Sequence, residues 1–281
     1  MYDILLLYYK KGSNLMGRNI NIIVANPAGN ITIFVLDKIE KEDYALVGKK
    51  LLDIKDLQGE QVAFIKELSS RDKLPFVGEI EMCGMEFCGN ASRSFALIAA
   101  KAMGLTGLNI VKVKTSGSKQ LLKVIIEADK GYTKIQMPNP LSIVNKDEMT
   151  IVDFGGIIHA VVKDADPTMK NFEKIKSLVE ELYDPPALGV MFYNTKDCFL
   201  TPIVYVKDVD TTYFEGSCGS GSTAVAISFA VQDELDQGTY KFQFNQPAGI
   251  ITSTIEKENG LIKAVYIEGM VEYSDIMTVE L

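Results

Sequence analysis

The sequence lacks tryptophan and has a single histidine, His159. One imidazole cannot build a multi-histidine metal site, and we expect no metal. Four cysteines among 281 residues are too few for a disulfide framework, so we expect reduced thiols. Cys83 and Cys88 are five residues apart with no second pair beside them, which argues against zinc.

An excess of basic residues and long apolar runs are also missing. The 29 Lys and Arg against 37 Asp and Glu give a net charge of −8, so we expect no nucleic-acid partner. No apolar stretch approaches the roughly 20 residues that cross a bilayer, so we expect no membrane association. In residues 1–15 the Lys pair follows the short apolar core, the reverse of a secretion signal. We therefore expect a cytoplasmic protein, take Met16 as the more natural start, and leave residues 1–15 out of the functional interpretation.

Short alternating segments rich in β-branched residues dominate the chain, and Gly, Pro and Asn bound them, which predicts strands. These segments lie at 20–26, 31–37, 110–116, 121–128, 133–138, 201–206, 240–246 and 250–256. Residues 42–57 and 169–183 have the spacing of amphipathic helices, whereas 92–103 and 222–235 are apolar almost all round. A helix that is apolar on every side belongs inside a core, so we expect strands to wrap around each of the last two.

The order of these elements repeats once along the chain. Residues 87–127 and 217–256 both run from Cys-Gly through small residues and an apolar helix to a strand, a Gly-containing loop and a second strand. We therefore expect an α/β (α+β) protein of two pseudo-symmetric domains, each a barrel-like sheet around a central apolar helix. The last segment has no counterpart in the repeat and is expected to complete the first sheet. The expected domains are 16–140 plus 269–281, with Cys88, and 141–268, with Cys218.

Each of these two cysteines stands where a turn of small residues enters a helix. Backbone N–H groups at a helix start lack intrahelical partners and favour negative charge, which predicts a lowered thiol pKa. The same kind of N–H group can cradle a carboxylate. The groups expected to do so belong to Gly89, Asn90, Gly219 and Ser220. Two such helix starts suit inversion at the α-carbon of an amino acid, because one thiolate can remove the proton while the opposite thiol protonates the other face. Cys83 and Cys198 lack this context and are expected in the core.

The two cysteine segments resemble a known pair of motifs. FCGNASRSFA at 87–96 and SCGSGSTAVA at 217–226 are similar to those of the cofactor-independent diaminopimelate epimerase superfamily, which includes proline racemase. The resemblance covers residues 20–281. It implies two α/β domains with the active site between them, Cys88 and Cys218 as the two bases, no cofactor, an amino-acid substrate and a homodimer.

Two further segments carry weaker parts of the resemblance. PAGNITIFVLD at 27–37 is similar to the N-terminal Gly-Asn signature, which implies that Asn30 contacts the substrate. FGGIIHAVV at 154–162 is similar to the Gly-Asn-Pro-His segment only in a glycine and in His159, which is implied as a substrate contact.

The departures from the superfamily concern the distal end of the substrate. Glu79 stands where diaminopimelate epimerase has an Asn. Its Glu-Arg pair falls at Val209 and Asp210, or at Val206 and Lys207 if the loop carries an insertion. A distal carboxylate would lose its Arg and face these acids, so diaminopimelate is expected to be the wrong substrate. NPAGN and EGSCGSGS are similar to the histidine racemases of opine-metallophore pathways, and imidazole can donate to a carboxylate. We expect a histidine racemase, in which the candidate side-chain partners are Glu79, Glu86, Asp210 and Glu215.

Several alternatives remain at this point. Diaminopimelate epimerase is one, and an amino-acid-binding module with inert cysteines is another, which would bind its ligand without exchanging the α-hydrogen. A pyridoxal phosphate racemase would need a Schiff-base Lys and a phosphate cradle, but the Gly loops at 115–119 and 245–249 are better explained as hairpin turns. A phenazine-type isomerase uses a carboxylate in place of the cysteines, and a thiol-redox protein would need a C-x-x-C pair, which is absent.

Overall fold

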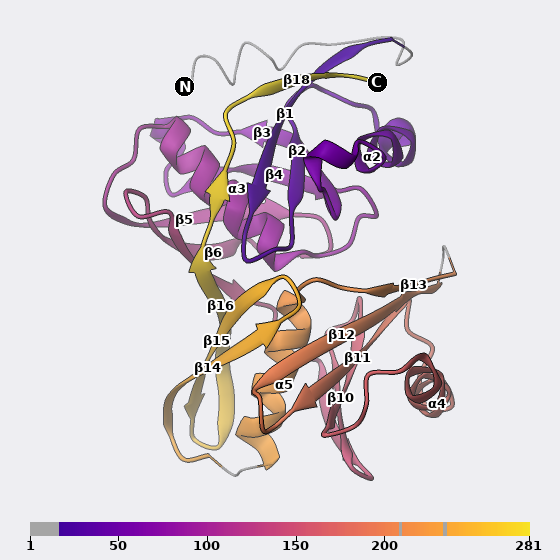
Figure 1. Cartoon of the computed structure of the whole chain (residues 1–281). Helices are drawn as coiled ribbons and strands as arrows, with labels where there is room; N and C mark the ends of the chain where they lie inside the picture. The colour runs from indigo at the N-terminus through magenta and orange to yellow at the C-terminus, as the bar shows by residue number, and fades with distance from the viewer. Residues whose placement is uncertain (1–16, 208–209, 233–234) are drawn as a thin grey trace. The chain divides into compact units, whose positions relative to one another are not determined.

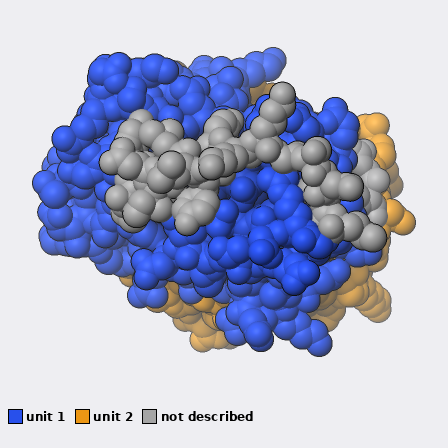
Figure 2. All heavy atoms as spheres, turned by 90° about the horizontal axis from the view of Figure 1, so that it is seen from above, with its two compact units in different colours: residues 1–135, 269–281 blue, residues 136–268 orange. Residues whose placement is uncertain are grey.

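The computed structural model describes residues 17–207, 210–232 and 235–281, so Met16 and the segment 1–15 lie outside the described residues. The chain divides into two compact units (Figure 2). Unit 1 takes in the chain up to Ile135 together with Gly269–Leu281, and unit 2 is Gln136–Glu268. Both units are mixed α/β structures with many strands and few helices (Figure 1). In the part of the chain that the structure describes, no helix is long and apolar enough to cross a membrane.

The described residues of unit 1 form nine strands and two α-helices, together with short 3-10 turns. The strands are β1 (Asn19–Asn26), β2 (Thr32–Val35), β3 (Gln61–Leu68), β4 (Phe76–Met82), β5 (Leu108–Thr115), β6 (Leu122–Glu127), β7 (Tyr132–Met137), β17 (Glu272–Tyr273) and β18 (Met277–Glu280). The helices are α2 (Tyr44–Leu52) and α3 (Gly89–Ala102).

The strands of unit 1 form one continuous series of pairings. β1 pairs antiparallel with β2, β2 parallel with β3, β3 antiparallel with β4, and β4 parallel with β5. Antiparallel pairing then continues from β5 through β6 to β7. The C-terminal strands β17 and β18 pair antiparallel with β1, so the end of the chain extends this sheet.

The α3 helix is the interior element of unit 1. Every residue of α3 except Lys101 is buried, and the strands β4, β5 and β6 contact it. Its Ala-rich sequence has little volume per turn, so backbone and strands approach closely. The amphipathic α2 instead covers β1–β3 from outside, where Val47 and Leu51 pack against Ile22, Val35 and Phe64. The cysteine at the start of α3 is therefore held between the sheet and its central helix.

In the part of unit 2 that the structure describes there are nine strands and two α-helices. The strands are β8 (Ser142–Lys146), β9 (Met149–Asp153), β10 (Ile158–Lys163), β11 (Ala187–Asn194), β12 (Phe199–Val206), β13 (Thr211–Phe214), β14 (Gly238–Gln246), β15 (Gly249–Glu258) and β16 (Leu261–Met270), the last of which runs on into unit 1. The helices are α4 (Met169–Glu180) and α5 (Gly219–Gln232).

The pairings of unit 2 follow the same order as those of unit 1. β9 pairs antiparallel with β10, β10 parallel with β11, β11 antiparallel with β12, and β12 parallel with β14. Antiparallel pairing continues from β14 through β15 to β16. The strands β8 and β13 are additions to this order. The sequence repeat thus corresponds to a repeat of strand pairings around α3 and α5.

Two separate apolar clusters lie on the two faces of the unit 2 sheet. On one face Val225 and Ile227 of α5 pack with Phe244 and Ile255. On the other face Phe172 and its neighbours on α4 pack against β10 and β11. The α5 helix is apolar on all sides because strands surround it, whereas α4 exposes one face.

Two local expectations need correction. Cys198 is exposed in the turn between β11 and β12, at φ +50°, and not in the core. The helices α3 and α5 begin at Gly89 and Gly219, three residues before the expected starts. Their first turns consist of Gly, Asn, Ala and Ser, which break the apolar pattern but are allowed in a helix whose start is capped.

Candidate active site

Cys88 is the N-cap residue of α3. Its backbone is extended, and its Sγ accepts the Ala91 N–H at 3.4 Å in place of the usual cap oxygen. The Cys88 carbonyl accepts both the N–H and the hydroxyl of Ser92, at 3.0 and 2.7 Å. These bonds fix the sulfur at the helix start, where the first N–H groups have no intrahelical partner.

A network of side-chain amides surrounds this sulfur. The Nε2 of Gln61 lies 3.2 Å from the Cys88 Sγ, 2.8 Å from the Asn30 Oδ1 and 2.8 Å from the Thr32 hydroxyl. Asn90 donates its Nδ2 to the same Asn30 oxygen at 3.2 Å. Asn30 and Asn90, both predicted to contact substrate, therefore meet beside the sulfur.

Glu60 adds a carboxylate to the edge of this network. Asn30 donates its Nδ2 to the Glu60 Oε2 at 3.0 Å, and partial burial raises the pKa of Glu60. Gln61 opens β3, Glu60 directly precedes it, and neither belongs to a motif. The sequence did not identify them, because only the folded chain brings Gln61, which pairs with Thr32 on β2, to a cysteine 27 positions later.

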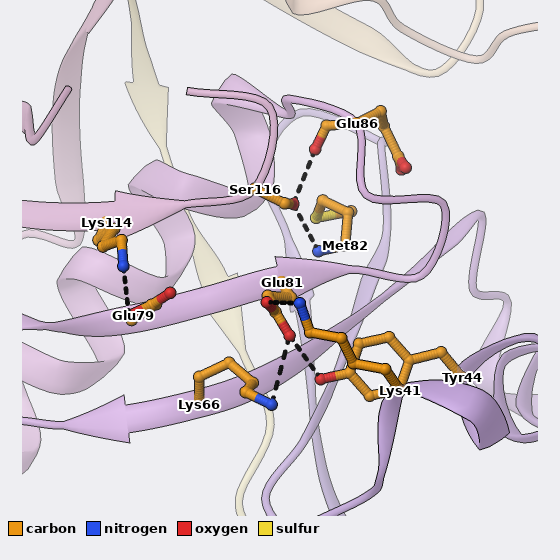
Figure 3. Close-up of polar contacts among 9 residues, drawn as sticks. All are labelled: Lys41, Tyr44, Lys66, Glu79, Glu81, Met82, Glu86, Lys114 and Ser116. Carbon is orange, nitrogen blue, oxygen red and sulfur yellow. Dashed lines mark hydrogen bonds and ion pairs between the residues drawn. The ribbon is translucent and has the colours of Figure 1, made fainter. Parts of the chain in front are cut away.

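The loop before Cys88 is fastened by Ser116. The Ser116 hydroxyl accepts the Met82 N–H at 2.8 Å and donates to the Glu86 carbonyl at 2.9 Å (Figure 3). The next residue, Gly117, has φ +70°, and a Cβ there would lie 2.3 Å from the Phe87 nitrogen. A glycine is therefore required where the β5–β6 turn packs against the loop that enters α3.

The start of α5 repeats the backbone geometry found at the start of α3. The Cys218 Sγ accepts the Gly221 N–H at 3.3 Å, and the Ser222 N–H and hydroxyl bind the Cys218 carbonyl at 2.9 and 2.7 Å. The Gln246 Oε1 accepts the Cys218 N–H at 2.8 Å. A Cβ on Gly221 would lie 2.1 Å from the Met191 sulfur, so only glycine fits there.

His159 reaches the second cysteine through a serine. Its Nε2 lies 2.9 Å from the Ser220 hydroxyl, which is itself 3.5 Å from the Cys218 Sγ. The ring is fully buried on β10, and burial lowers the pKa of His159 to about 3, so it is neutral. The predicted residues Ser220 and His159 therefore form one chain of contacts that ends at the sulfur.

Both thiols have raised pKa values, contrary to the expectation from their place at helix starts. Burial raises the pKa of Cys88 to about 11, against the lowering effect of the Ala91 N–H and Gln61. Burial also raises the pKa of Cys218, and the nearby Glu215 carboxylate raises it further. Loss of solvation by the thiolate outweighs the helix N–H groups in both cases.

Glu79 and Asp210 already have partners of their own. Glu79 lies on β4 beside Glu81 and forms an ion pair with Lys114 at 3.2 Å (Figure 3). Asp210 is exposed and accepts a hydrogen bond from the Tyr205 hydroxyl at 3.0 Å. The structure records no contact of either carboxylate with Cys88 or Cys218 among the described residues.

The neighbouring Glu81 has a structural environment. Its buried carboxylate binds Lys41 at 2.6 Å, Lys66 at 3.4 Å and the Tyr44 hydroxyl at 2.8 Å (Figure 3). Burial opposes its charge, but these donors hold the pKa of Glu81 below its usual range. This cluster fastens the start of α2 to β3 and β4.

Within the described ranges, no group of three or more His, Cys, Asp or Glu side chains is placed to hold a metal ion.

Comparison with known proteins assigns the family. The model of the histidine racemase CntK N-terminal domain matches residues 19–276, which is most of the chain. The chain belongs to the histidine racemase CntK family. A histidine racemase of Fusobacterium nucleatum is 32% identical over 266 residues, which cover 90% of this chain and 93% of that protein. A histidine racemase of Staphylococcus aureus is 27% identical over 261 residues, covering 88% of this chain and 92% of that protein.

Solved structures share the fold of this CntK-family chain. A PhzF-family phenazine biosynthesis protein of Bacillus anthracis superposes with a TM-score of 0.64 at 16% identity, covering 93% of this chain and 99% of that one. A hydroxyproline epimerase of Agrobacterium vitis superposes with a TM-score of 0.59 at 11% identity, covering 94% and 93%. These structures share the mixed α/β fold that the sequence predicted, and the family match confirms the expected likeness to histidine racemases.

Proposed function

We propose that this protein interconverts L- and D-histidine by a two-base mechanism. The observation that carries the proposal is the matching geometry of the two cysteines in a chain of the histidine racemase family. Each sulfur accepts the N–H three residues ahead, and each cysteine carbonyl binds the serine four residues ahead.

The reaction needs one thiolate and one thiol. One cysteine, as thiolate, takes the α-proton as the Cα–H bond breaks, and the electron pair moves into the substrate carboxylate. The other cysteine, as thiol, then donates its proton to the opposite face of the α-carbon. The two cysteines have exchanged protonation states at the end, so L- and D-histidine begin from opposite forms of the enzyme.

The first N–H groups of α3 and α5 suit the substrate carboxylate. Negative charge grows on this group in the transition state, and N–H groups that are already oriented stabilise it without rearrangement. We assign this role to Gly89 and Asn90 in unit 1 and to Gly219 and Ser220 in unit 2. In this proposal the two pseudo-symmetric domains expected from the sequence correspond to units 1 and 2, one with Cys88 and the other with Cys218.

The remaining assignments concern Asn30, His159 and the carboxylates that could bind the imidazole. Asn30 is assigned to the substrate beside Cys88, and His159 acts beside Cys218 through Ser220. Glu79 and Asp210 remain candidates for the imidazole, although binding would require release from Lys114 and Tyr205. Glu60 is a carboxylate already joined to the Cys88 network, and its raised pKa suits acceptance of a hydrogen bond from a neutral ring.

Isotope exchange tests this function directly. L-histidine in deuterated water should gain α-deuterium and lose optical rotation, with no added pyridoxal phosphate or metal. Cys88→Ser and Cys218→Ser should each lower the racemisation rate by about 10²–10⁴-fold or more. Cys198→Ser, which changes an exposed thiol, is the matched control and should leave the rate unchanged. Faster exchange of diaminopimelate than of histidine would contradict the substrate, and binding without exchange would contradict the enzyme.

Assembly and location belong to the same proposal. The resemblance supports a homodimer, and light scattering should give about twice the 31.0 kDa of one chain. We also propose a cytoplasmic location for this acidic chain. Fractionation of cells that produce the full chain would check this location.

A further inference from the structure

Arg93 is a charged residue with an unusual environment. It lies on α3, five positions after Cys88, and its side chain is 0% exposed. None of the carboxylates in the described part of the chain forms an ion pair with it. Burial lowers the pKa of Arg93 to about 10, so the guanidinium still carries its charge at neutral pH. A buried charge without an ionic partner is costly, which calls for a reason to keep it.

Neutral groups satisfy this guanidinium. The Arg93 Nε donates to the Asn90 Oδ1 at 3.1 Å. Its Nη1 donates to the Thr133 hydroxyl at 3.1 Å and to the carbonyls of Gly269 and Met270 at 3.1 and 3.4 Å. These contacts fix the side chain but leave its positive charge without a carboxylate.

Two groups that are not carboxylates, Cys88 and Tyr132, affect the charge of Arg93. Cys88 and Tyr132, when ionised, favour the charged form of the guanidinium. On the Cys88 sulfur itself, the Ala91 N–H and Gln61 lower the thiol pKa, and the Glu86 carboxylate raises it. Glu60, held by Asn30, is the further titratable group joined to this network.

Arg93 also decides which way the neighbouring amides point. Arginine has only donors, so the atom of Asn90 that faces it must be the oxygen. The Asn90 NH₂ group then faces Asn30, whose oxygen must accept it. The same Asn30 oxygen also accepts a hydrogen bond from Gln61, so the end of the Gln61 side chain at this point is its NH₂ group. The nitrogen of this NH₂ group is also the atom that lies 3.2 Å from the Cys88 sulfur. Arg93, fixed on α3, thus causes Gln61 to place its NH₂ group, and not its carbonyl, next to the Cys88 thiol.

We propose that Arg93 is a positioning residue that prepares Cys88 to act as a base. It orients the amides of Asn90, Asn30 and Gln61 so that the Gln61 NH₂ group faces the sulfur. The inference rests on the proposed function only for the role of Cys88 as a base.

Alkylation of Cys88 by iodoacetamide over a range of pH tests this role without needing racemase activity. The background is the full chain with Cys83→Ser, Cys198→Ser and Cys218→Ser, so that mass spectrometry follows one thiol. Arg93→Met should move the alkylation midpoint to higher pH by about one unit and slow the reaction about tenfold at a fixed pH below it. Arg93→Lys keeps the charge without the forked donors and should give a smaller shift.

Arg71→Met is the matched control. Arg71 donates to the carbonyls of Met103 and Gly104 at the opposite end of α3, at 2.6 and 3.0 Å. Its loss removes a comparable helix contact far from the sulfur, and the alkylation profile should stay unchanged. A folded Arg93→Met with the profile of the Arg71→Met control would overturn the proposal.

If Arg93→Met does not fold, two further variants test the positioning role of Arg93. Arg93→Lys and Asn90→Ala should both shift the midpoint upward, because each interrupts the orientation of Gln61. Unchanged profiles in both would overturn the proposal. Failure of the native chain to exchange histidine would refute the proposed function while leaving the alkylation result interpretable.

Discussion

The imidazole of His159 and the hydroxyl of Ser220 lie 2.9 Å apart inside unit 2, and the hydroxyl continues toward the sulfur of Cys218. Burial lowers the pKa of His159 to about 3, so the ring is a neutral hydrogen-bonding group at physiological pH. The ring therefore positions the serine without adding a charge beside the thiol.

This burial predicts how stability depends on pH. Below pH 6.5 the unfolded chain protonates His159, whereas the folded chain does not until about pH 3. The contribution of the neutral ring is therefore complete above pH 6.5 and is lost as pH falls, at about 1.4 kcal/mol per pH unit. Urea unfolding of the native chain and of His159→Gln at pH 7 and pH 5 measures this loss. The native chain should lose more stability than the variant, and equal losses would contradict a buried neutral ring.

Gly189 predicts a steric requirement at the same ring. A Cβ on Gly189 would lie 2.3 Å from the His159 Nδ1 and 2.8 Å from the Met191 Cε. Gly189→Ala should lower the free energy of unfolding by about 1–3 kcal/mol and slow racemisation, because the ring must move away from Ser220. Gly156→Ala is the matched control, since a Cβ there meets nothing within 4 Å. Equal stability of the two variants, measured by thermal melting, would refute this close contact.

The raised thiol pKa values predict a pH–rate profile. At neutral pH little of either cysteine is thiolate, because burial raises the pKa of Cys88 to about 11 and that of Cys218 as well. The value of kcat/KM for histidine should therefore increase with pH from 7 to 9, by up to about tenfold per unit. It should fall again where the second thiol loses the proton that it must donate. A rate that is constant from pH 6 to 9 would contradict thiolate formation in the free enzyme.

The sequence revealed the part of the site that depends on local structure. Cys-Gly followed by small residues and an apolar helix predicts a helix start, and both cysteines cap their helices with the same contacts. Gln61 and Arg93 were not recognised as functional, because their roles depend on strand pairing and on burial. Gln61 comes near Cys88 only in the folded chain, where it pairs with Thr32 on β2, and Arg93 becomes an interior charge because strands contact α3.

Tertiary structure adds two effects that the sequence did not show. The parallel register of β4 and β5 sets Glu79 directly opposite Lys114, so the carboxylate has a partner that its place in the sequence did not reveal. Helix N–H groups do lower the pKa of each thiol, but burial raises it by more. Both outcomes depend on which residues lie across the sheet or around the sulfur.

The most direct test of two opposed bases is the isotope content of both enantiomers early in the reaction. L-histidine is supplied in deuterated water, and the α-hydrogen of each enantiomer is measured by mass spectrometry after separation. Two bases predict that D-histidine carries solvent deuterium from the first turnovers while the remaining L-histidine stays protiated. Early D-histidine that retains the substrate hydrogen would instead mean that one group removes and returns the proton, and would contradict the paired roles of Cys88 and Cys218.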